Sequence, residues 1–182
     1  FIDELEKGIS GSKSSGQTDG GTTARVFGTI LQWMQEKKTP VFVVATSNDV
    51  SQLPPELLRA GRFDAMFFID LPNAAERNEI WQIQIRKYEH KPEDFDLELL
   101  ASSTEGFTGA EIEAVFVDAL YSAFDGSTSP DDTHVVRAIG ETVPLSRTMS
   151  CEIQKLREWS MGRARRATLE TVDVKPNGRT LL

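Results

Sequence analysis

The stretch Pro40-Val41-Phe42-Val43-Val44-Ala45 decides the fold class of this chain. After the proline it is a continuous apolar run, rich in β-branched residues, with no alternation of apolar and polar positions. Such a run is typical of a strand buried on both faces, in a parallel sheet that helices cover. Met66-Phe67-Phe68-Ile69 repeats the pattern, and Phe1-Ile2 has the composition expected at the end of a third buried strand.

Helical patterns separate these expected strands. Residues 22–37 carry apolar side chains at helical spacing, and Pro54-Pro55 precedes a short helix expected over 56–59. Residues 8–21, rich in Gly and Ser, are expected to form a flexible loop. The first 72 residues therefore follow the order strand, helix, strand, helix, strand, which indicates part of a doubly wound α/β sheet.

The pattern changes after Pro72, where amphipathic helical spacing takes over. A fifth helix is expected to begin near Ser146 or Thr148 and to end at about residue 162, and no strand is expected between 73 and 165. The four helices expected before it cover 74–88, 96–103, 109–124 and 131–141.

We therefore expect three parts in the chain. Residues 1–72 form part of an α/β domain, residues 73–165 form a small all-α domain, and residues 166–182 form a tail. The tail has weak apolar alternation, which is compatible with a strand or with disorder.

The composition excludes several classes of protein. The 182 residues carry 28 acidic and 20 basic side chains, a formal net charge of −8, which argues against a general nucleic-acid-binding surface. No apolar run approaches the ~20 residues of a membrane span, so no membrane contact is expected. The single cysteine, Cys151, excludes an internal disulfide and a multi-cysteine metal site, and it fits a reducing compartment such as the cytoplasm.

Adjacent carboxylates follow the first expected strand. Asp3 and Glu4 come directly after Phe1-Ile2, and in an open parallel sheet ligands bind beyond the carboxyl ends of the strands. One carboxylate there can hold Mg²⁺ through its water shell, and its neighbour can orient and deprotonate an attacking water. Acid pairs are also common on solvated surfaces, and the pair alone does not separate the two interpretations.

Two further polar groups follow in chain order. Asn48 ends the stretch Thr46-Ser47-Asn48 after the next strand, at the same expected edge, where its amide can contact water or phosphate. A turn asparagine is the alternative. Arg59 and Arg62 lie on either side of Gly61 before the last strand. A guanidinium donates two parallel hydrogen bonds to phosphate oxygens, although such arginines are also found solvated or in ion pairs.

In this order the motifs resemble those of AAA ATPases, over residues 1 to about 125. Phe1-Ile2-Asp3-Glu4 resembles a Walker B motif, and Thr46-Ser47-Asn48 resembles the end of the sensor-1 strand. Leu58-Arg59-Ala60-Gly61-Arg62-Phe63-Asp64 is similar to part of the second region of homology, and Gly106-Phe107-Thr108-Gly109-Ala110-Glu111-Ile112 to the start of the sensor-2 helix. The stretch Trp33-Met34-Gln35-Glu36-Lys37 is similar to the corresponding stretch in a subgroup of AAA proteins known from cyanobacterial and plastid reading frames.

The resemblance implies roles for the five polar residues. Asp3 would support Mg²⁺, Glu4 would be the general base for water, and Asn48 would sense the terminal phosphate of ATP. Arg59 and Arg62 would reach the nucleotide of the neighbouring subunit as arginine fingers. These roles imply a homo-oligomeric ring, which we expect to be a hexamer.

Four positions of the helical domain, the lid of the AAA fold, would close over adenine and ribose. Ile80 and Gln84 lie one turn apart on the first lid helix, and Gly109 and Ala110 open the third. Gln84 stands where many relatives have His, which places the ribose contact in question. Ala110 follows Gly109, so no sensor-2 arginine is evident.

The phosphate-binding pattern G-x-x-x-x-G-K-[ST] does not occur in the 182 residues. We therefore expect residues 1–72 to be the C-terminal part of the nucleotide-binding domain, of the P-loop NTPase type, and the chain alone to have no ATPase activity. The whole protein would use ATP and Mg²⁺ to remodel a protein client, in the cytoplasm or in a plastid stroma. The alternative is a catalytically inactive, nucleotide-regulated scaffold or binding module.

Overall fold

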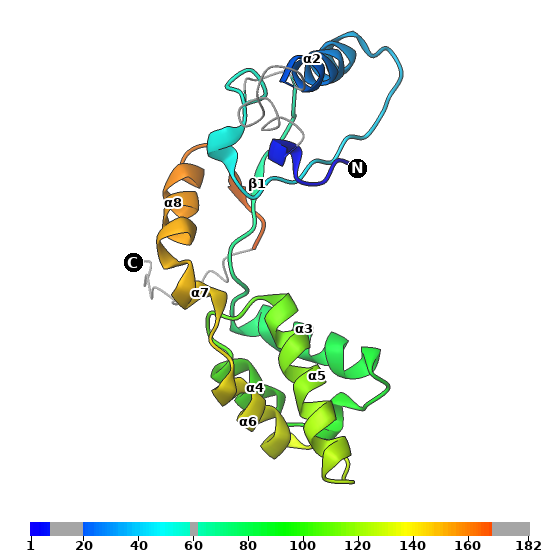
Figure 1. The fold of residues 1–182 in the computed structure, drawn as a ribbon, viewed down its shortest axis with the longest axis vertical. Helices are drawn as coiled ribbons and strands as arrows, with labels where there is room; N and C mark the ends of the chain where they lie inside the picture. The colour runs from blue at the N-terminus through cyan, green and yellow to red at the C-terminus, as the bar shows by residue number, and fades with distance from the viewer. Residues whose placement is uncertain (8–19, 59–61, 169–182) are drawn as a thin grey trace, which may run out of the picture. The chain divides into compact units, whose positions relative to one another are not determined.

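A computed structural model describes residues 1–7, 20–58 and 62–168 of the chain. The structure divides into two compact units, the first made of Phe1–Phe67 with Trp159–Arg165 and the second of Phe68–Glu158 with Arg166–Leu182 (Figure 1). Most of the loop expected over 8–21, the residue Arg59 and most of the tail lie outside the described residues.

A parallel bridge between Ile2 and Ala45 organises the first unit. The Ile2 N–H donates to the Val44 carbonyl and the Thr46 N–H donates to the Ile2 carbonyl, both at 2.9 Å. Helix α2 (Gly20–Glu36) lies between the two segments in the chain and confirms the helix predicted over 22–37, although its first two residues were expected in the loop. Parallel strands need such a connection, because a short turn cannot return the chain to the same direction.

The apolar runs of the first unit are more exposed than the sequence predicts. The pattern predicts strands buried on both faces, yet Phe42 is 92% exposed and Phe67 is 60% exposed. Among the described residues the run over 41–45 is bridged only at Ala45, on one side. A strand is buried on both faces only where strands flank it and helices cover it. The parallel pairing is therefore as predicted, and the burial prediction is wrong for these runs.

The segment over 54–58 forms turns where a helix was predicted. Leu57 N–H donates to the Pro54 carbonyl at 3.0 Å, and Leu58 N–H donates to the Pro55 carbonyl at 3.2 Å. Both bonds span three residues, as in a 3₁₀ turn, and the two prolines supply no N–H of their own. A short 3₁₀ helix, η1 (Val50–Gln52), precedes these turns.

Strands β1 (Phe67–Phe68) and β2 (Arg165–Arg166) form a two-stranded sheet. Arg165 N–H donates to the Met66 carbonyl and Ala167 N–H donates to the Phe68 carbonyl, both at 2.9 Å. Donors and acceptors advance in the same direction, so the pair is parallel. β2 begins at the last residue of the range in which no strand was expected, and its two arginines show no apolar alternation.

Four helices form the bundle of the second unit, and they confirm the predicted helices with each end within one residue. Each helix begins directly after a side chain that accepts a backbone N–H of the first turn. Asn73 and Thr108 complete reciprocal capping boxes with Glu76 and Glu111. The helices are α3 (Ala74–Lys87), α4 (Leu97–Ser103), α5 (Gly109–Asp125) and α6 (Asp132–Glu141), with a 3₁₀ turn, η2 (Pro92–Asp94), before α4.

The predicted fifth helix is divided into α7 (Leu145–Thr148) and α8 (Ser150–Ser160). Met149 separates them with φ −119° and ψ 33°, outside the helical region. The helical segment also begins earlier than predicted, directly after Pro144, which has no N–H to leave unsatisfied at a helix start.

Phe116 on α5 lies at the centre of the core of the second unit. It is fully buried, and the rings of Trp81, Tyr88, His90 and Phe95 have centroids within 6.2 Å of its own. These contacts tie α3 to α5, so the lid positions on both helices stand on one packed scaffold. The core residues are Trp81, Ile85, Phe95, Leu100, Phe107, Ile112, Val115, Phe116, Ala119, Val135 and Ala138.

Candidate functional site

The polar residues that follow the two bridged segments meet at one edge of the first unit. Because Ile2 and Ala45 pair in parallel, both segments leave the bridge in the same direction. The Asn48 Nδ2 then donates a hydrogen bond to Glu4 Oε1 at 3.2 Å, across 44 positions of sequence. The structure therefore brings together Glu4 and Asn48, two of the residues singled out from the sequence.

Thr46 connects both acids of the pair. Its Oγ1 donates to Asp3 Oδ1 at 2.5 Å and accepts the Glu4 N–H at 3.0 Å. One hydroxyl on the second segment thus fixes the side chain of Asp3 and the backbone of Glu4. The sequence pattern placed Thr46 in the motif but gave it no role, because a hydroxyl between a strand and a turn is common on any fold.

Glu4 has an uncommon backbone conformation. Its φ is +49°, in the left-handed region that non-glycine residues rarely adopt and that costs roughly 1–2 kcal/mol. Its carboxylate also pairs with Lys7 Nζ at 2.7 Å, and this hydrogen bond raises the pKa of Lys7. An exposed ion pair of this kind contributes little stability, so Lys7 holds the carboxylate only loosely.

Glu6 is a site residue that sequence reasoning missed. It is 4% exposed, and its Oε1 accepts the Asn48 N–H at 3.1 Å. Burial alone would raise the pKa of Glu6, but the Ser47 side chain and the backbone amides of Glu6 and Asn48 outweigh it and lower the pKa. Glu6 thus anchors the backbone of Asn48, while Glu4 accepts its side chain. No feature of the sequence distinguishes Glu6 from an acid exposed to solvent.

The arginines stand apart from the acids. Arg62 is half-buried, and its buried Nη1 has no hydrogen-bond partner among the described residues. No hydrogen bond or ion pair of the described residues joins it to Asp3, Glu4 or Asn48. Arg59 lies outside the described residues. The structure therefore does not bring Arg62 to the edge of its own chain that carries Asp3, Glu4 and Asn48.

A pocket of about 640 Å³ lies in the second unit, and Ile80, Ile83, Thr108 and Gly109 are among the residues that line it. A Cβ built on Gly109 would lie 3.8 Å from Ile80 Cδ1, an ordinary contact, so packing against Ile80 does not require the glycine. The absent side chain instead leaves backbone accessible to a ligand.

The other two lid positions lie outside the lining of this pocket. Gln84, one turn after Ile80, has a buried Oε1 without a hydrogen-bond partner among the described residues. Ala110 follows Gly109 in the first turn of α5. Ile80 and Gly109 are therefore brought together at the pocket, whereas Gln84 and Ala110 are neighbours of it in sequence only.

The donor sets fit the groups that the sequence implies. Asp3, Glu4 and Thr46 supply oxygen atoms alone, which suits Mg²⁺ and not a softer metal. No group of three or more His, Cys, Asp or Glu is arranged to hold a metal within the described ranges, which is compatible with an ion held by one carboxylate, water and phosphate oxygens. The apolar pocket fits a flat base, whereas the unpartnered Gln84 Oε1 is buried outside its lining.

Two family models match parts of the chain. Residues 1–71 match the ATPase family associated with various cellular activities (AAA), and residues 94–128 match the AAA+ lid domain. In the parts of the chain that the structure describes, no helix has the length and apolarity that crossing a membrane requires.

The similar ycf46 proteins match almost the whole chain. It is 42% identical over 170 residues to the uncharacterized AAA domain-containing protein ycf46 of Guillardia theta, across 92% of this chain and 33% of that protein. It is 43% identical to the protein of the same name from Pyropia yezoensis, across 93% and 34%. A proteasome-activating nucleotidase of Aeropyrum pernix is 38% identical over 130 residues, across 68% of this chain and 30% of that protein.

The chain thus spans about a third of the length of the curated relatives it matches. The AAA match includes Asp3, Glu4 and Asn48, and the lid match includes Thr108 and Gly109 of the pocket. The chain belongs to the AAA family of ATPases.

Proposed function

We propose that the whole protein binds ATP with Mg²⁺ and hydrolyses it, with Glu4 as the general base. The observation that carries this proposal is the meeting of Asp3, Glu4 and Asn48 at the edge beyond the Ile2–Ala45 bridge. Mg²⁺, when bound, neutralises charge on the phosphate oxygens. Asp3 supports the ion, Asn48 orients the carboxylate and the terminal phosphate, and Glu4 takes the proton of the attacking water.

The lid holds the other end of the nucleotide in this proposal. Ile80, Gly109, Gln84 and Ala110 close over adenine and ribose; the apolar pocket supports Ile80 and Gly109, and neither Gln84 nor Ala110 lines it. Residues 1–72 act as the C-terminal part of a doubly wound nucleotide-binding domain, residues 73–165 as the lid and residues 166–182 as a tail.

We further propose a homo-oligomeric ring, hexameric, in which Arg59 and Arg62 serve the neighbouring subunit's nucleotide. Arg62 has no ion pair among the described residues, which supports this because a guanidinium without an acid of its own chain can pair with another; its Nη1 is buried here and must first be uncovered. A protein client is supported by the similarity to a proteasome-activating nucleotidase. Nucleic acid and membrane are not proposed as partners. The proposed location is the cytoplasm, or a plastid stroma in view of the similarity to ycf46 proteins.

A catalytically inactive, nucleotide-regulated scaffold is the second candidate. It is favoured by one observation: Glu4 is engaged by Asn48 and by Lys7, so its carboxylate is not free in this conformation. In the first candidate these contacts are exchanged when ATP binds. In the second they persist, and ATP acts only as a ligand.

Phosphate release by the whole protein with ATP and Mg²⁺ separates the two candidates. The ATPase proposal expects turnover in the wild type and loss of turnover in Glu4→Gln, with no turnover by the 182-residue chain alone. A whole protein that binds ATP without turnover supports the scaffold. Turnover by the chain alone that Glu4→Gln abolishes would contradict the proposed domain boundary.

A further inference from the structure

Helix α8 contributes an apolar wall to the pocket of the second unit. Ile153 and Leu156 line the pocket from α8, while Ile80 and Gly109 line it from α3 and α5. Ile153 and Leu156 are three positions apart and therefore share one face of the helix. Arg157 is the next residue along α8 and lies one turn after Ile153.

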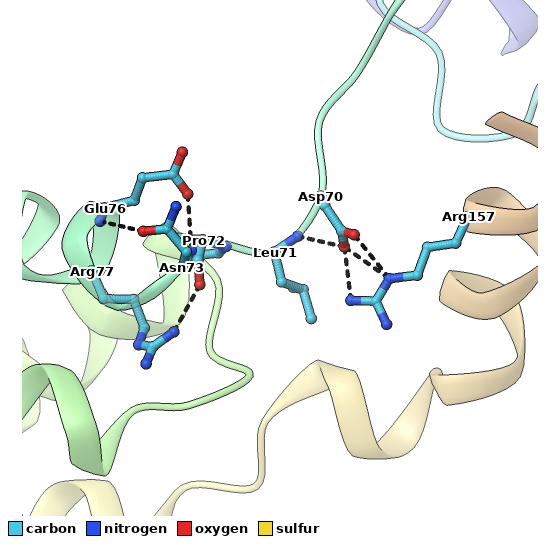
Figure 2. A network of polar contacts seen from close by, with 7 residues as sticks. All are labelled: Asp70, Leu71, Pro72, Asn73, Glu76, Arg77 and Arg157. Carbon is cyan, nitrogen blue, oxygen red and sulfur yellow. Dashed lines mark hydrogen bonds and ion pairs between the residues drawn. The ribbon is translucent and has the colours of Figure 1, made fainter. Parts of the chain in front are cut away.

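Arg157 makes a forked ion pair with Asp70, which itself lines the pocket. The Nε lies 2.9 Å from Asp70 Oδ2 and the Nη2 lies 2.8 Å from Asp70 Oδ1. Figure 2 shows the guanidinium reaching from α8 to the carboxylate. Asp70 Oδ1 also accepts the Leu71 N–H at 2.8 Å, so the orientation of the carboxylate is set by its own backbone.

The segment that carries Asp70 is firmly held on the bundle side. Arg77, which is 6% exposed, donates from Nη1 to the Pro72 carbonyl at 2.8 Å and from Nε to the Ala101 carbonyl at 2.9 Å. Asn73 then caps α3 (Figure 2). The backbone that follows Asp70 is therefore held in place by the bundle, and Asp70 can position an element that binds to it.

α8, in contrast, is weakly packed. Within the described part of the second unit, none of the core residues comes from α8. A helix of 11 residues has little stability of its own in water. The position of α8 therefore depends on a small number of contacts, and the forked pair with Asp70 is a directional one among them.

We propose that Asp70 and Arg157 are positioning residues for the nucleoside end of ATP, because their ion pair holds α8 where Ile153 and Leu156 complete the apolar wall of the pocket. This inference rests on the proposed function, which takes the pocket as the adenine site. Neither residue touches the reacting phosphate. The pair therefore acts on the affinity for ATP, and its loss raises KM while kcat stays close to that of the wild type.

The test compares Asp70→Asn, Arg157→Gln and the double variant of the whole protein. Each single variant is expected to weaken ATP binding about three- to tenfold, the range for one partly exposed, charge-assisted contact. Binding of inorganic tripolyphosphate, which has no base, stays unchanged. The double variant is expected to have the same ATP affinity as the single variant with the lower affinity, because both changes remove the same interaction. Amide hydrogen exchange over 150–160 speeds up in all three variants, and exchange in α5 does not change.

Arg137→Gln and Glu141→Gln provide the matched controls, since they break an ion pair on α6 whose side chains are 71% and 68% exposed. Unchanged ATP affinity in both Asp70→Asn and Arg157→Gln overturns the inference, and so does an equal loss of ATP and tripolyphosphate binding. A wild-type protein that binds no ATP overturns the proposed function as well. Unchanged hydrogen exchange over 150–160 in the variants overturns the claim that the ion pair holds α8, whatever their ATP affinity.

Discussion

The side-chain amide of Asn48 donates a hydrogen bond to the carboxylate of Glu4 at 3.2 Å, although 44 positions separate the two residues. The backbone of Asn48 is held independently, because its N–H donates to the buried Glu6 at 3.1 Å. The amide is therefore aimed at Glu4 by an anchor that does not involve Glu4. This arrangement makes the contribution of the Asn48 side chain separable from the fold around it.

Asn48→Ala should lower ATP turnover by the whole protein about 10²-fold, the usual cost of removing one positioned donor. The anchor to Glu6 uses the backbone and survives the change, so stability should hardly move. Steady-state phosphate release measures the effect. Asn78→Ala, which removes an amide that accepts from Gln82 on α3, is the matched control and should leave turnover unchanged. Equal losses in the two variants would contradict a specific role for Asn48.

Arg62→Ala should abolish turnover in the ring by acting on the neighbouring subunit. Mixing this variant with Glu4→Gln tests the point, because a site formed between an Arg62→Ala subunit and a Glu4→Gln neighbour keeps an intact Glu4 and an intact Arg62. Random assembly of equal amounts makes about a quarter of the sites of this kind, so the mixture should regain activity that neither variant has alone. A mixture as inactive as its components would show that Arg62 serves its own chain or none.

Phe116→Ala should destabilise the bundle by about 3–5 kcal/mol, because Phe116 is fully buried among four aromatic rings. Phe124 on the same helix is 83% exposed, and Phe124→Ala should change the free energy of unfolding by no more than about 0.5 kcal/mol. Denaturant unfolding followed by circular dichroism measures both. Similar losses in the two variants would mean that the core is centred elsewhere.

The ion pair of Asp70 predicts an acid limit to stability. Burial alone would raise the pKa of Asp70, but hydrogen bonds from Arg157 and from the Leu71 N–H lower it below the ordinary value of 3.8. A lowered pKa contributes stability above 3.8 that is lost as the pH falls through the folded-state value. The free energy of unfolding should therefore fall more steeply between pH 5 and pH 2 in the wild type than in Asp70→Asn. Parallel curves would refute a stabilising pair.

Local chemistry explains what could be predicted from the sequence. The starts of α3, α4, α5 and α6 follow from the capping side chain directly before each helix. The meeting of Asp3, Glu4 and Asn48 at one edge could be predicted because each follows an apolar run, and parallel pairing places the ends of such runs together.

The features that could not be predicted from the sequence depend on tertiary contacts. The pattern of Phe42 predicts burial, but burial depends on strands and helices that cover it, and a short apolar run contains no information on those neighbours. Glu6 has the sequence surroundings of a surface acid, yet it is buried and accepts a hydrogen bond from Asn48, 42 positions along the chain. Met149 sits in a helical pattern, and its departure from helical geometry depends on how α7 and α8 are held.

Hydrolysis by Glu4→Gln in the whole protein tests the central claim most directly. The substitution keeps the size of the side chain and an acceptor for Asn48, and it removes the base. We expect turnover to fall about 10²–10⁴-fold, the contribution of a positioned general base, with ATP still bound and recoverable as ATP after gel filtration. Glu36→Gln, at an exposed position of α2, should behave as the wild type. Turnover that persists in Glu4→Gln would contradict the account.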